Sequence, residues 1–255
     1  MIEINEVKTR KQIKEFVEFP LRLYKGNPYF VPPLYGDEKA LFKKNTVYSE
    51  QAESVFFLAT QNGKTVGRIQ GIIQHQYNDI HNKKQVRFTR FDCENDVEIA
   101  RALFSAVETW AKDNGMEEVV GPLGYSDLER EGLLIEGFDY LSTFEEQYNY
   151  EYYGKLVEEC GYAKDVDWVE SRLFSTPQQD ERLKMLADRA LTRHNLHIGG
   201  EGLNIRQFIK KYAKGIFHCI DECYKDLYGV VPFTPEMMKQ MIDQFLLIIN
   251  RRYVI

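Results

Sequence analysis

The stretch from Ser54 to Ile73 constrains the fold of this chain more than any other. It reads SVFFLATQNGKTVGRIQGII, two apolar runs that meet at Asn62-Gly63. A tight hairpin turn needs positive φ at both central residues, which Asn tolerates and Gly adopts without strain. The first run, Val55 to Ala59, is apolar on both faces, as is typical of an interior strand covered from both sides. The sequence therefore predicts an antiparallel hairpin whose two faces the rest of the chain must cover.

Composition and charge exclude several classes of protein. The chain has 255 residues, of which 44% are apolar, and a formal net charge of -6, so no chain-wide basic field exists to hold nucleic acid or anionic lipid. The cysteines show no disulfide-framework spacing, the first residues do not resemble a signal peptide, and the apolar run over 245–249 is too short to cross a bilayer. We expect a cytoplasmic protein with free thiols, no nucleic-acid partner and no membrane span. The four cysteines are Cys93, Cys160, Cys219 and Cys223.

Alternating apolar residues over 2–7 predict a first strand, and Thr9 is placed to cap a helix over 10–23. Closely spaced prolines then force extended backbone over 26–33, with aromatic residues available for burial. This segment is interpreted either as a packed connector or as the lining of a ligand groove.

A strand, helix and strand follow the hairpin and predict a crossover unit with a parallel strand pair. The strands are expected over 85–91 and 118–123. The helix between them begins after Asn95 or Asp96 and ends at Gly115. The other elements expected in this part are a polar loop over 75–84, a short helix over 148–160 and a strand over 165–174.

A polar, proline-containing segment over 175–180 predicts a domain boundary. We expect one domain over 1–175 and the start of a second over 176–255. The elements expected in the second part are a helix over 181–194, a strand over 196–198, helices over 205–228 and 235–248, and a strand over 252–255.

A weak internal repeat supports two related domains. An aromatic-glycine-proline passage follows the first helix, with Tyr24-Lys25-Gly26 and Val31-Pro32, and returns late as Tyr228-Gly229 and Val231-Pro232. If the second half repeats the first, its strand over 253–255 lacks a hairpin partner. Because an open strand edge recruits another strand, we expect packing on the first domain or, next, a homodimer, and the remaining alternative is a partly disordered second part.

The helix expected over 205–228 carries residues that could suggest a metal site. Cys219 and Cys223 lie four residues apart, but helical geometry points His218 to the opposite side, so no metal site is expected. The two thiols are interpreted as buried structural cysteines. A basic group on the outer side of the helix is interpreted as a solvated face or as an anion contact. Its members are Arg206, Lys210, Lys211 and Lys214.

The glycine-rich, acidic loop that leaves the strand over 118–123 is a candidate substrate pocket. The alternative interpretation is a compact structural loop with tyrosines packed over the sheet. If it is a pocket, its carboxylates favour a cationic amine and tyrosine faces add cation-π attraction. The candidate pocket residues are Tyr125, Asp127, Glu131, Glu136, Tyr148, Tyr152 and Tyr153.

With this order of elements, the first 175 or so residues resemble the GNAT acyltransferase fold, a mixed α/β fold with a central mixed sheet flanked by helices. The whole chain is similar to the front part of a bacterial family of tandem GNAT-like proteins. The resemblance rests on an Asn-Pro-Tyr-x-Val-Pro-Pro passage over 27–33, a Gly-Pro-Leu-Gly loop over 121–124 and a Lys-Asp-Leu-Tyr-Gly turn over 225–229. It implies acetyl transfer from acetyl-coenzyme A to a small-molecule amine.

The chain departs from the GNAT pattern where the resemblance places the chemistry. The connection over 92–98, which in that fold is a glycine-rich pyrophosphate loop, has no glycine and four carboxylates. Val157 stands where the family has a tyrosine general acid, and Tyr153 could replace it only in a different helix register. We therefore expect a degenerate first domain with no tightly bound cofactor and no assigned catalytic residue. Either activity depends on a complete second domain, or the chain is a noncatalytic ligand-binding or interaction domain.

Overall fold

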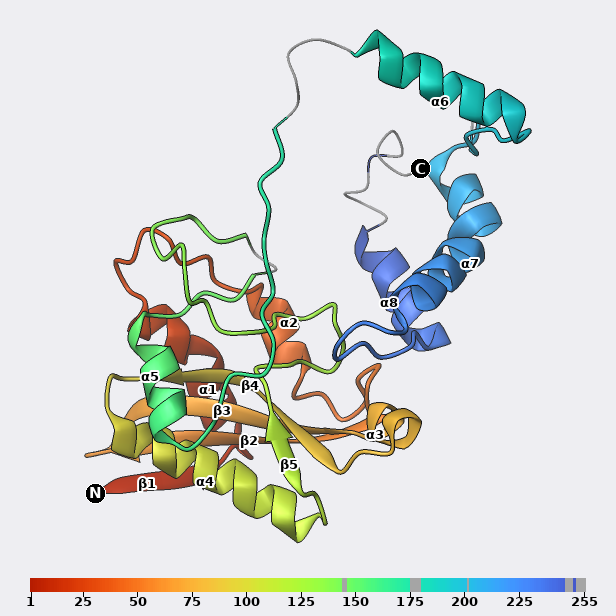
Figure 1. Cartoon of the computed structure of the whole chain (residues 1–255). Coiled ribbons are helices and arrows are strands. Elements are labelled where there is room, and N and C mark those ends of the chain that lie inside the picture. The colour runs from red at the N-terminus through yellow and green to blue at the C-terminus, as the bar shows by residue number, and fades with distance from the viewer. Residues whose placement is uncertain (144–145, 175–179, 201, 246–249, 251–255) are drawn as a thin grey trace. The chain divides into compact units, whose positions relative to one another are not determined.

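The structure is a computed structural model that describes residues 1–143, 146–174, 180–200, 202–245 and 250 (Figure 1). The chain divides into two compact units. Unit 1 comprises residues 1–167 together with 225–232, and unit 2 comprises 168–224 together with 233–255. Within the described ranges, no helix is long and apolar enough to cross a membrane.

Unit 1 is built on a five-stranded mixed sheet with the order β1-β2-β3-β4-β5 (Figure 1). The first four strands pair antiparallel with their neighbours, and β4 pairs parallel with β5, where Val86 lies opposite Val119. The expected mixed sheet and crossover unit are confirmed. The strands are β1 (Ile2–Glu6), β2 (Ala52–Gln61), β3 (Lys64–Gln74), β4 (Gln85–Cys93) and β5 (Glu118–Val120).

The predicted hairpin is confirmed in detail. Gln61 pairs with Lys64, so the loop has two residues, and Asn62 and Gly63 have φ of +52° and +74°. Along β2, alternate side chains pack into different clusters. Phe56 and Leu58 pack with residues of α1, whereas Phe57 and Ala59 belong to the core under α4. Both faces of this interior strand are therefore covered, as its sequence requires.

The two covering helices begin at the expected caps. Helix α1 (Arg10–Leu23) starts with a capping box between Thr9 and Gln12. Helix α4 (Val97–Asp113) starts at Asp96, whose side chain accepts a hydrogen bond from the Glu98 amide. Its apolar stripe packs on the sheet to form the main core, in which Leu103 and Val107 are fully buried.

Other elements of unit 1 differ from expectation. Helices α2 (Tyr35–Ala40) and α3 (His75–His81) were not predicted, and α3 replaces an expected loop because Gln74 caps its start and Asn82 adopts a left-handed conformation at its end. The expected helix over 148–160 is shorter, α5 (Tyr152–Glu159). The expected strand over 165–174 is wrong. That segment pairs with no strand among the described residues, and its apolar side chains, such as Leu173, are exposed.

Unit 2 contains three helices in the residues that the structure describes: α6 (Glu181–Arg193), α7 (Ile205–Tyr224) and α8 (Pro235–Phe245). The expected strand over 196–198 is wrong, and α7 ends four residues earlier than expected because 225–232 belong to unit 1. The prediction for 252–255 and the expected end of α8 lie outside the described residues. That unit 2 starts a second GNAT-like domain, with a boundary near 175, stays a prediction.

The expected burial of the α7 cysteines is also wrong. Cys219 and Cys223 are exposed, whereas Phe217 is buried with its ring centroid 5.1 Å from that of Phe233. The larger apolar side chain takes the interior position, which turns the cysteines outward. In the parts of the chain that the structure describes, no three His, Cys, Asp or Glu side chains gather in a way that could hold a metal ion.

Candidate functional site

A buried ionic network lies next to α1 in unit 1. Arg68 of β3 contacts Asp92 of β4 at 2.8 Å (Nε to Oδ2) and Glu38 of α2 at 3.6 Å. Arg90 of β4 contacts Glu38 at 3.1 Å and Glu129 at 2.9 Å. These five side chains are at most 15% exposed. Charges buried to this degree require partners, and here each charged side chain has at least one.

An irregularity in the sheet brings Arg90 into this network. The register of β3 against β4 shifts between Arg68 and Gln70, and Arg90 has φ of +48°, a left-handed conformation unusual for arginine. Its side chain donates to Gln70 Oε1 at 2.9 Å as well as to the two carboxylates. Bulges and backbone strain of this kind cluster at functional sites, which makes this part of β4 a candidate site.

The charge states in the network follow from its geometry. Burial alone would raise the pKa of Glu38, but the positive charges of Arg90 and Arg68 hold it below its ordinary value. Glu38 is therefore a carboxylate at neutral pH. Burial similarly opposes the charge of Arg90, yet Glu38 and Glu129 raise its pKa above the ordinary value.

An apolar hollow of about 320 Å³ opens beside this network. We call it the α1 hollow. Residues of α1, of the proline-containing connector and of α2 line it: Val17, Leu21, Pro32, Pro33, Tyr35 and Glu38. Glu38 is the one charged residue of this lining. The connector over 26–33 is packed, because Tyr29 O accepts hydrogen bonds from the Ser142 amide and side chain. The same connector also lines a groove through Pro32 and Pro33.

The structure places part of the predicted pocket beside a buried arginine. Arg87 of β4 is 1% exposed and donates to the carbonyls of Gly124 at 3.2 Å and Gly229 at 2.9 Å. Burial lowers the pKa of Arg87, and Tyr77, Glu131 and Asp127 are among the groups that oppose this shift. Burial raises the pKa of Glu131 to about 7, with Asp127 and Glu129 adding to the rise against the opposing effect of Arg87.

Tyr125 and Glu136 of the same loop have different surroundings. Tyr125 is buried, its hydroxyl donates to Ser54 Oγ at 2.7 Å, and its ring stacks on Tyr48 at 4.5 Å between centroids. Glu136 is exposed. Tyr125 therefore fixes the loop to the sheet.

The three tyrosines at the start of α5 contact a different region. Tyr153 is fully buried, its hydroxyl lies 3.3 Å from Asp92 Oδ1, and the same carboxylate oxygen accepts from Tyr24 at 2.9 Å. Tyr152 donates to Cys93 O at 2.8 Å, and Tyr148 donates to a carbonyl of the acidic loop. Burial first and Asp92 second raise the pKa of Tyr24 and Tyr153, so both remain protonated donors.

Of the predicted pocket residues, Asp127 and Glu131 act on Arg87, and Tyr153 is joined through Asp92 to the ionic network. The remaining four belong to neither group: Tyr125, Glu136, Tyr148 and Tyr152. The role of all seven in substrate binding stays a prediction.

Sequence reasoning missed four members of the network, Glu38, Arg68, Arg90 and Glu129, and it also missed Tyr24, which donates to Asp92. The only signal for it was polar residues at alternate positions of strands that are otherwise apolar, such as Arg68 and Gln70 in β3.

The N-terminus of α4 does not fit a coenzyme pyrophosphate. The Glu98 amide already donates to the Asp96 carboxylate at 2.9 Å, and the Asp96 amide donates to Glu94 O at 2.7 Å. Negative side chains therefore occupy the position where a helix terminus would hold a phosphate. That the connection does not bind the coenzyme in the usual GNAT way stays a prediction.

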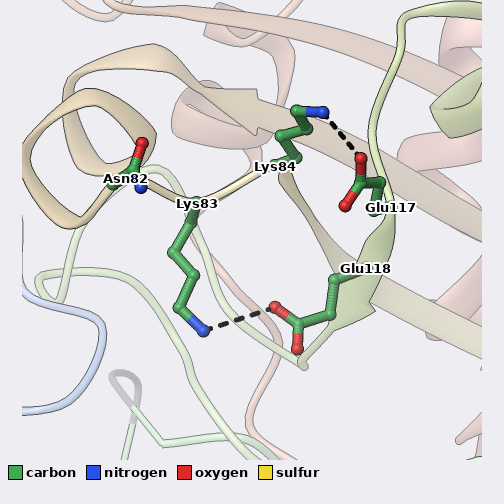
Figure 2. A pocket seen from close by; sticks show the side chains of 5 residues that line it. All are labelled: Asn82, Lys83, Lys84, Glu117 and Glu118. Carbon is green, nitrogen blue, oxygen red and sulfur yellow. Dashed lines mark hydrogen bonds and ion pairs between the residues drawn. The ribbon is translucent and has the colours of Figure 1, made fainter.

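A second surface hollow, of about 550 Å³, lies where β4 and β5 begin. Figure 2 shows its five lining residues, with Lys84 paired to Glu117 at 2.6 Å and Lys83 to Glu118 at 3.7 Å. Asn82 completes the lining. The paired side chains are about half exposed or more, and ligand sites in α/β sheets lie at the opposite, carboxyl ends of the strands. We assign this hollow no role.

The strand order, the parallel β4–β5 pair joined through α4, and the covering helices agree with the mixed sheet and flanking helices that the resemblance to the GNAT fold implies for unit 1. No family model matches the chain. Over 99% of its length it is similar to a bacterial ceramide synthase of Caulobacter vibrioides, with 28% identity and 65% of that protein covered. It is also similar to Protein YghO of Escherichia coli, with 26% identity over 92% of this chain and 59% of that protein. The chain spans less than two thirds of either relative.

Solved structures with some similarity include an aminoglycoside acetyltransferase from a soil metagenomic sample and a tandem GNAT protein from the clavulanic acid pathway. The first has a TM-score of 0.40 at 14% identity, covering 69% of this chain and 97% of that one. The second has a TM-score of 0.43 at 11% identity, covering 63% of this chain and 43% of that one.

Proposed function

We propose that this chain is part of a GNAT-type N-acyltransferase that joins an acyl group to an amine. The observation that carries the proposal is the similarity to a bacterial ceramide synthase over 99% of the chain, on a unit 1 with the GNAT-like fold. A ceramide is the amide of a long-chain amino alcohol with a fatty acid. The reaction class is therefore attack of an amine nitrogen on the carbonyl carbon of an acyl thioester. The C–N bond forms, the C–S bond breaks, and the sulfur leaves as a thiol while the amine nitrogen loses a proton.

This chemistry needs a group that accepts a proton from the attacking amine. Glu131 suits that role because its pKa is about 7 and a general base works best near the operating pH. Arg87 and Asp127 set its charge environment. The acyl donor expected from the fold is an acyl-coenzyme A, and we place its pyrophosphate away from the acidic connection between β4 and α4.

The direct test is to incubate the purified protein with an acyl-coenzyme A and a long-chain amine. Amide product is followed by mass spectrometry, and the released thiol by colorimetry. We expect amide formation that Glu131→Gln reduces by about 10²-fold or more, whereas Glu117→Gln, at the hollow to which we assign no role, leaves it unchanged. Amine binding without any amide would favour the rival, a noncatalytic binding domain. The proposal would be overturned if the protein neither bound the amine nor formed the amide.

Calorimetric titration with acetyl-coenzyme A tests the acidic connection separately. The interpretation of Glu94 and Asp96 predicts no tight binding at the α4 terminus. Tight binding that Asp96→Lys leaves unchanged would place the pyrophosphate at another location, because an added positive charge would strengthen a phosphate site at this helix terminus. Tight binding that Asp96→Asn strengthens would contradict our interpretation, because it would place the pyrophosphate at this helix.

A further inference from the structure

We propose that helix α6 of unit 2 lies on the surface of an anionic lipid bilayer, with its apolar side in the bilayer and its basic side chains among the head groups. The inference concerns an interaction surface and does not depend on the proposed reaction. Three observations carry it: an apolar stripe that no described part of the chain covers, basic side chains on both borders of that stripe, and acidic side chains opposite it.

The apolar stripe of α6 follows from the periodicity of its sequence. At about 100° per residue, five of its six apolar side chains fall within an arc of about 140°. No residue of α6 is buried, and Leu183 and Leu186 are 65% and 55% exposed. A stripe of this width normally faces a core, but the described part of the chain leaves this one without an apolar partner. The stripe consists of Leu183, Leu186, Ala187, Ala190 and Leu191.

The charged side chains of α6 are sorted by sign about this stripe. Arg182 and Arg193 lie on one border of the stripe, and Lys184 lies on the other. The two acidic residues, Glu181 and Asp188, project from the opposite side of the helix. Basic side chains at such borders reach lipid head groups while their stems cover apolar surface, and acidic side chains on the far side stay in water.

This arrangement suits anionic lipid better than a second copy of α6. A symmetric pair of these helices would place basic borders against basic borders, because neither border carries an acidic residue. The head groups of an anionic bilayer instead attract the basic side chains of both borders. Helix α6 has four basic and two acidic residues, a local excess that the net charge of -6 for the whole chain conceals.

The proposal is tested by sedimenting the purified full chain with lipid vesicles. One set of vesicles contains phosphatidylcholine alone, and the other contains phosphatidylcholine and phosphatidylglycerol in equal parts. We expect binding to the anionic vesicles to be at least about tenfold tighter than to the neutral ones, because each basic residue near an anionic surface contributes about fivefold. Binding to neither set, or equal binding to both, would overturn the proposal.

A pair of substitutions in the stripe tests the apolar contact. Leu183→Gln with Leu186→Gln should weaken binding to the anionic vesicles by about tenfold or more, and glutamine keeps the helix propensity. The matched control is Leu34→Gln with Ile80→Gln in unit 1, where the side chains are 62% and 56% exposed and no change is expected. Because all four side chains are exposed, circular dichroism should show an unchanged fold.

A second pair tests the basic borders. Arg182→Gln with Arg193→Gln should weaken binding to the anionic vesicles by about tenfold, whereas Lys210→Gln with Lys214→Gln, an exposed pair on α7 with the same change of charge, should have little effect. Equal losses from the two pairs would overturn the location on α6. Light scattering provides the last check, since stripe substitutions that dissociate a dimer but leave vesicle binding intact would overturn the choice of lipid as the partner.

Discussion

Arg90 links two parts of unit 1 through a backbone conformation that its residue type disfavours. Its left-handed φ of +48° costs free energy, and its contacts with Glu38 and Glu129 offset that cost. Without the guanidinium, both carboxylates would lose a buried positive partner. The residue therefore couples α2 to the acidic loop.

Replacing Arg90 by Met should lower the free energy of unfolding by about 3–5 kcal/mol, because it removes the ion pair of buried Glu129 and leaves buried Glu38 with Arg68 alone. The matched control is Lys84→Met, which removes an exposed ion pair with Glu117 and should cost less than about 1 kcal/mol. Urea denaturation followed by circular dichroism measures both. Similar losses for the two variants would show that the Arg90 network is not buried as described.

Glu131 gives stability a pH dependence whose sign is set by its raised pKa. The folded value is about 7 against an ordinary value of 4.5, so the folded chain holds this proton more tightly than the unfolded chain. The contribution of this group is most favourable at acid pH and is lost as pH rises from about 4.5 to about 7. Glu131→Gln should therefore raise the Tm relative to the parent at about pH 8 and not at about pH 4.

Exposed Glu136 provides the control for this effect, since Glu136→Gln should change the Tm little and equally at both pH values. A Glu131→Gln variant that is less stable than the parent at the higher pH would show instead that the ionised carboxylate stabilises Arg87. Thermal melts in matched ionic strength distinguish these results, because salt screens exposed charges more than buried ones.

At the scale of elements, the close approach of α4 to β3 depends on a position without a side chain. A Cβ added at Gly67 would lie 2.8 Å from Leu103 Cδ1 and 3.0 Å from Cys93 Cβ. Helix α4 can thus lie against the sheet only because Gly67 leaves room for its leucine. The sequence shows this glycine inside a strand, a position that often marks close backbone approach.

Gly67→Ala should destabilise the protein by about 1–3 kcal/mol, because the added methyl group forces α4 or Cys93 to shift. Gly154→Ala in α5 is the control, since a Cβ there meets no heavy atom within 4 Å and an alanine favours a helix by about 1 kcal/mol. Chemical denaturation should show that Gly67→Ala lowers the free energy of unfolding and that Gly154→Ala raises it. A neutral Gly67→Ala would mean that α4 packs less closely than described.

At the scale of the whole molecule, the segment Lys225–Pro232 belongs to unit 1 although its chain neighbours on both sides belong to unit 2. Arg87 donates to Gly229 O across 142 residues of sequence, and the Tyr228 hydroxyl donates to Asp165 at 2.6 Å. Val231 is 1% exposed. This segment is thus held against unit 1 by both buried and surface contacts.

Arg87→Met should speed amide hydrogen exchange in a peptide covering 225–232, because Gly229 O loses its buried donor. Tyr228→Phe, which removes a surface hydrogen bond, should have a smaller effect of the same sign and guards against a variant that fails to fold. Lys83→Met is the control with no expected change. Unaltered exchange in both Arg87→Met and Tyr228→Phe would contradict the anchoring of this segment.

The sequence by itself determined the elements whose causes are local. Asn62-Gly63 specified the hairpin through its own φ preferences, Asp96 specified the start of α4, and alternation along β2 specified two covered faces. Each of these signals acts over a few residues, so it can be interpreted without knowing the rest of the fold. The mixed sheet and the resemblance to the GNAT fold followed from their order.

The tertiary structure alone decided which polar side chains meet. Arg68 reaches Asp92 across 24 residues of sequence, Arg90 reaches Glu38 across 52, and the turn at Gly229 returns to Arg87. The failed strand over 165–174 has the same origin, because apolar alternation forms a strand only where a neighbouring strand is free to pair. Burial and hydrogen-bond partners depend on distances in space between segments remote in the chain, and no local preference of either segment encodes them.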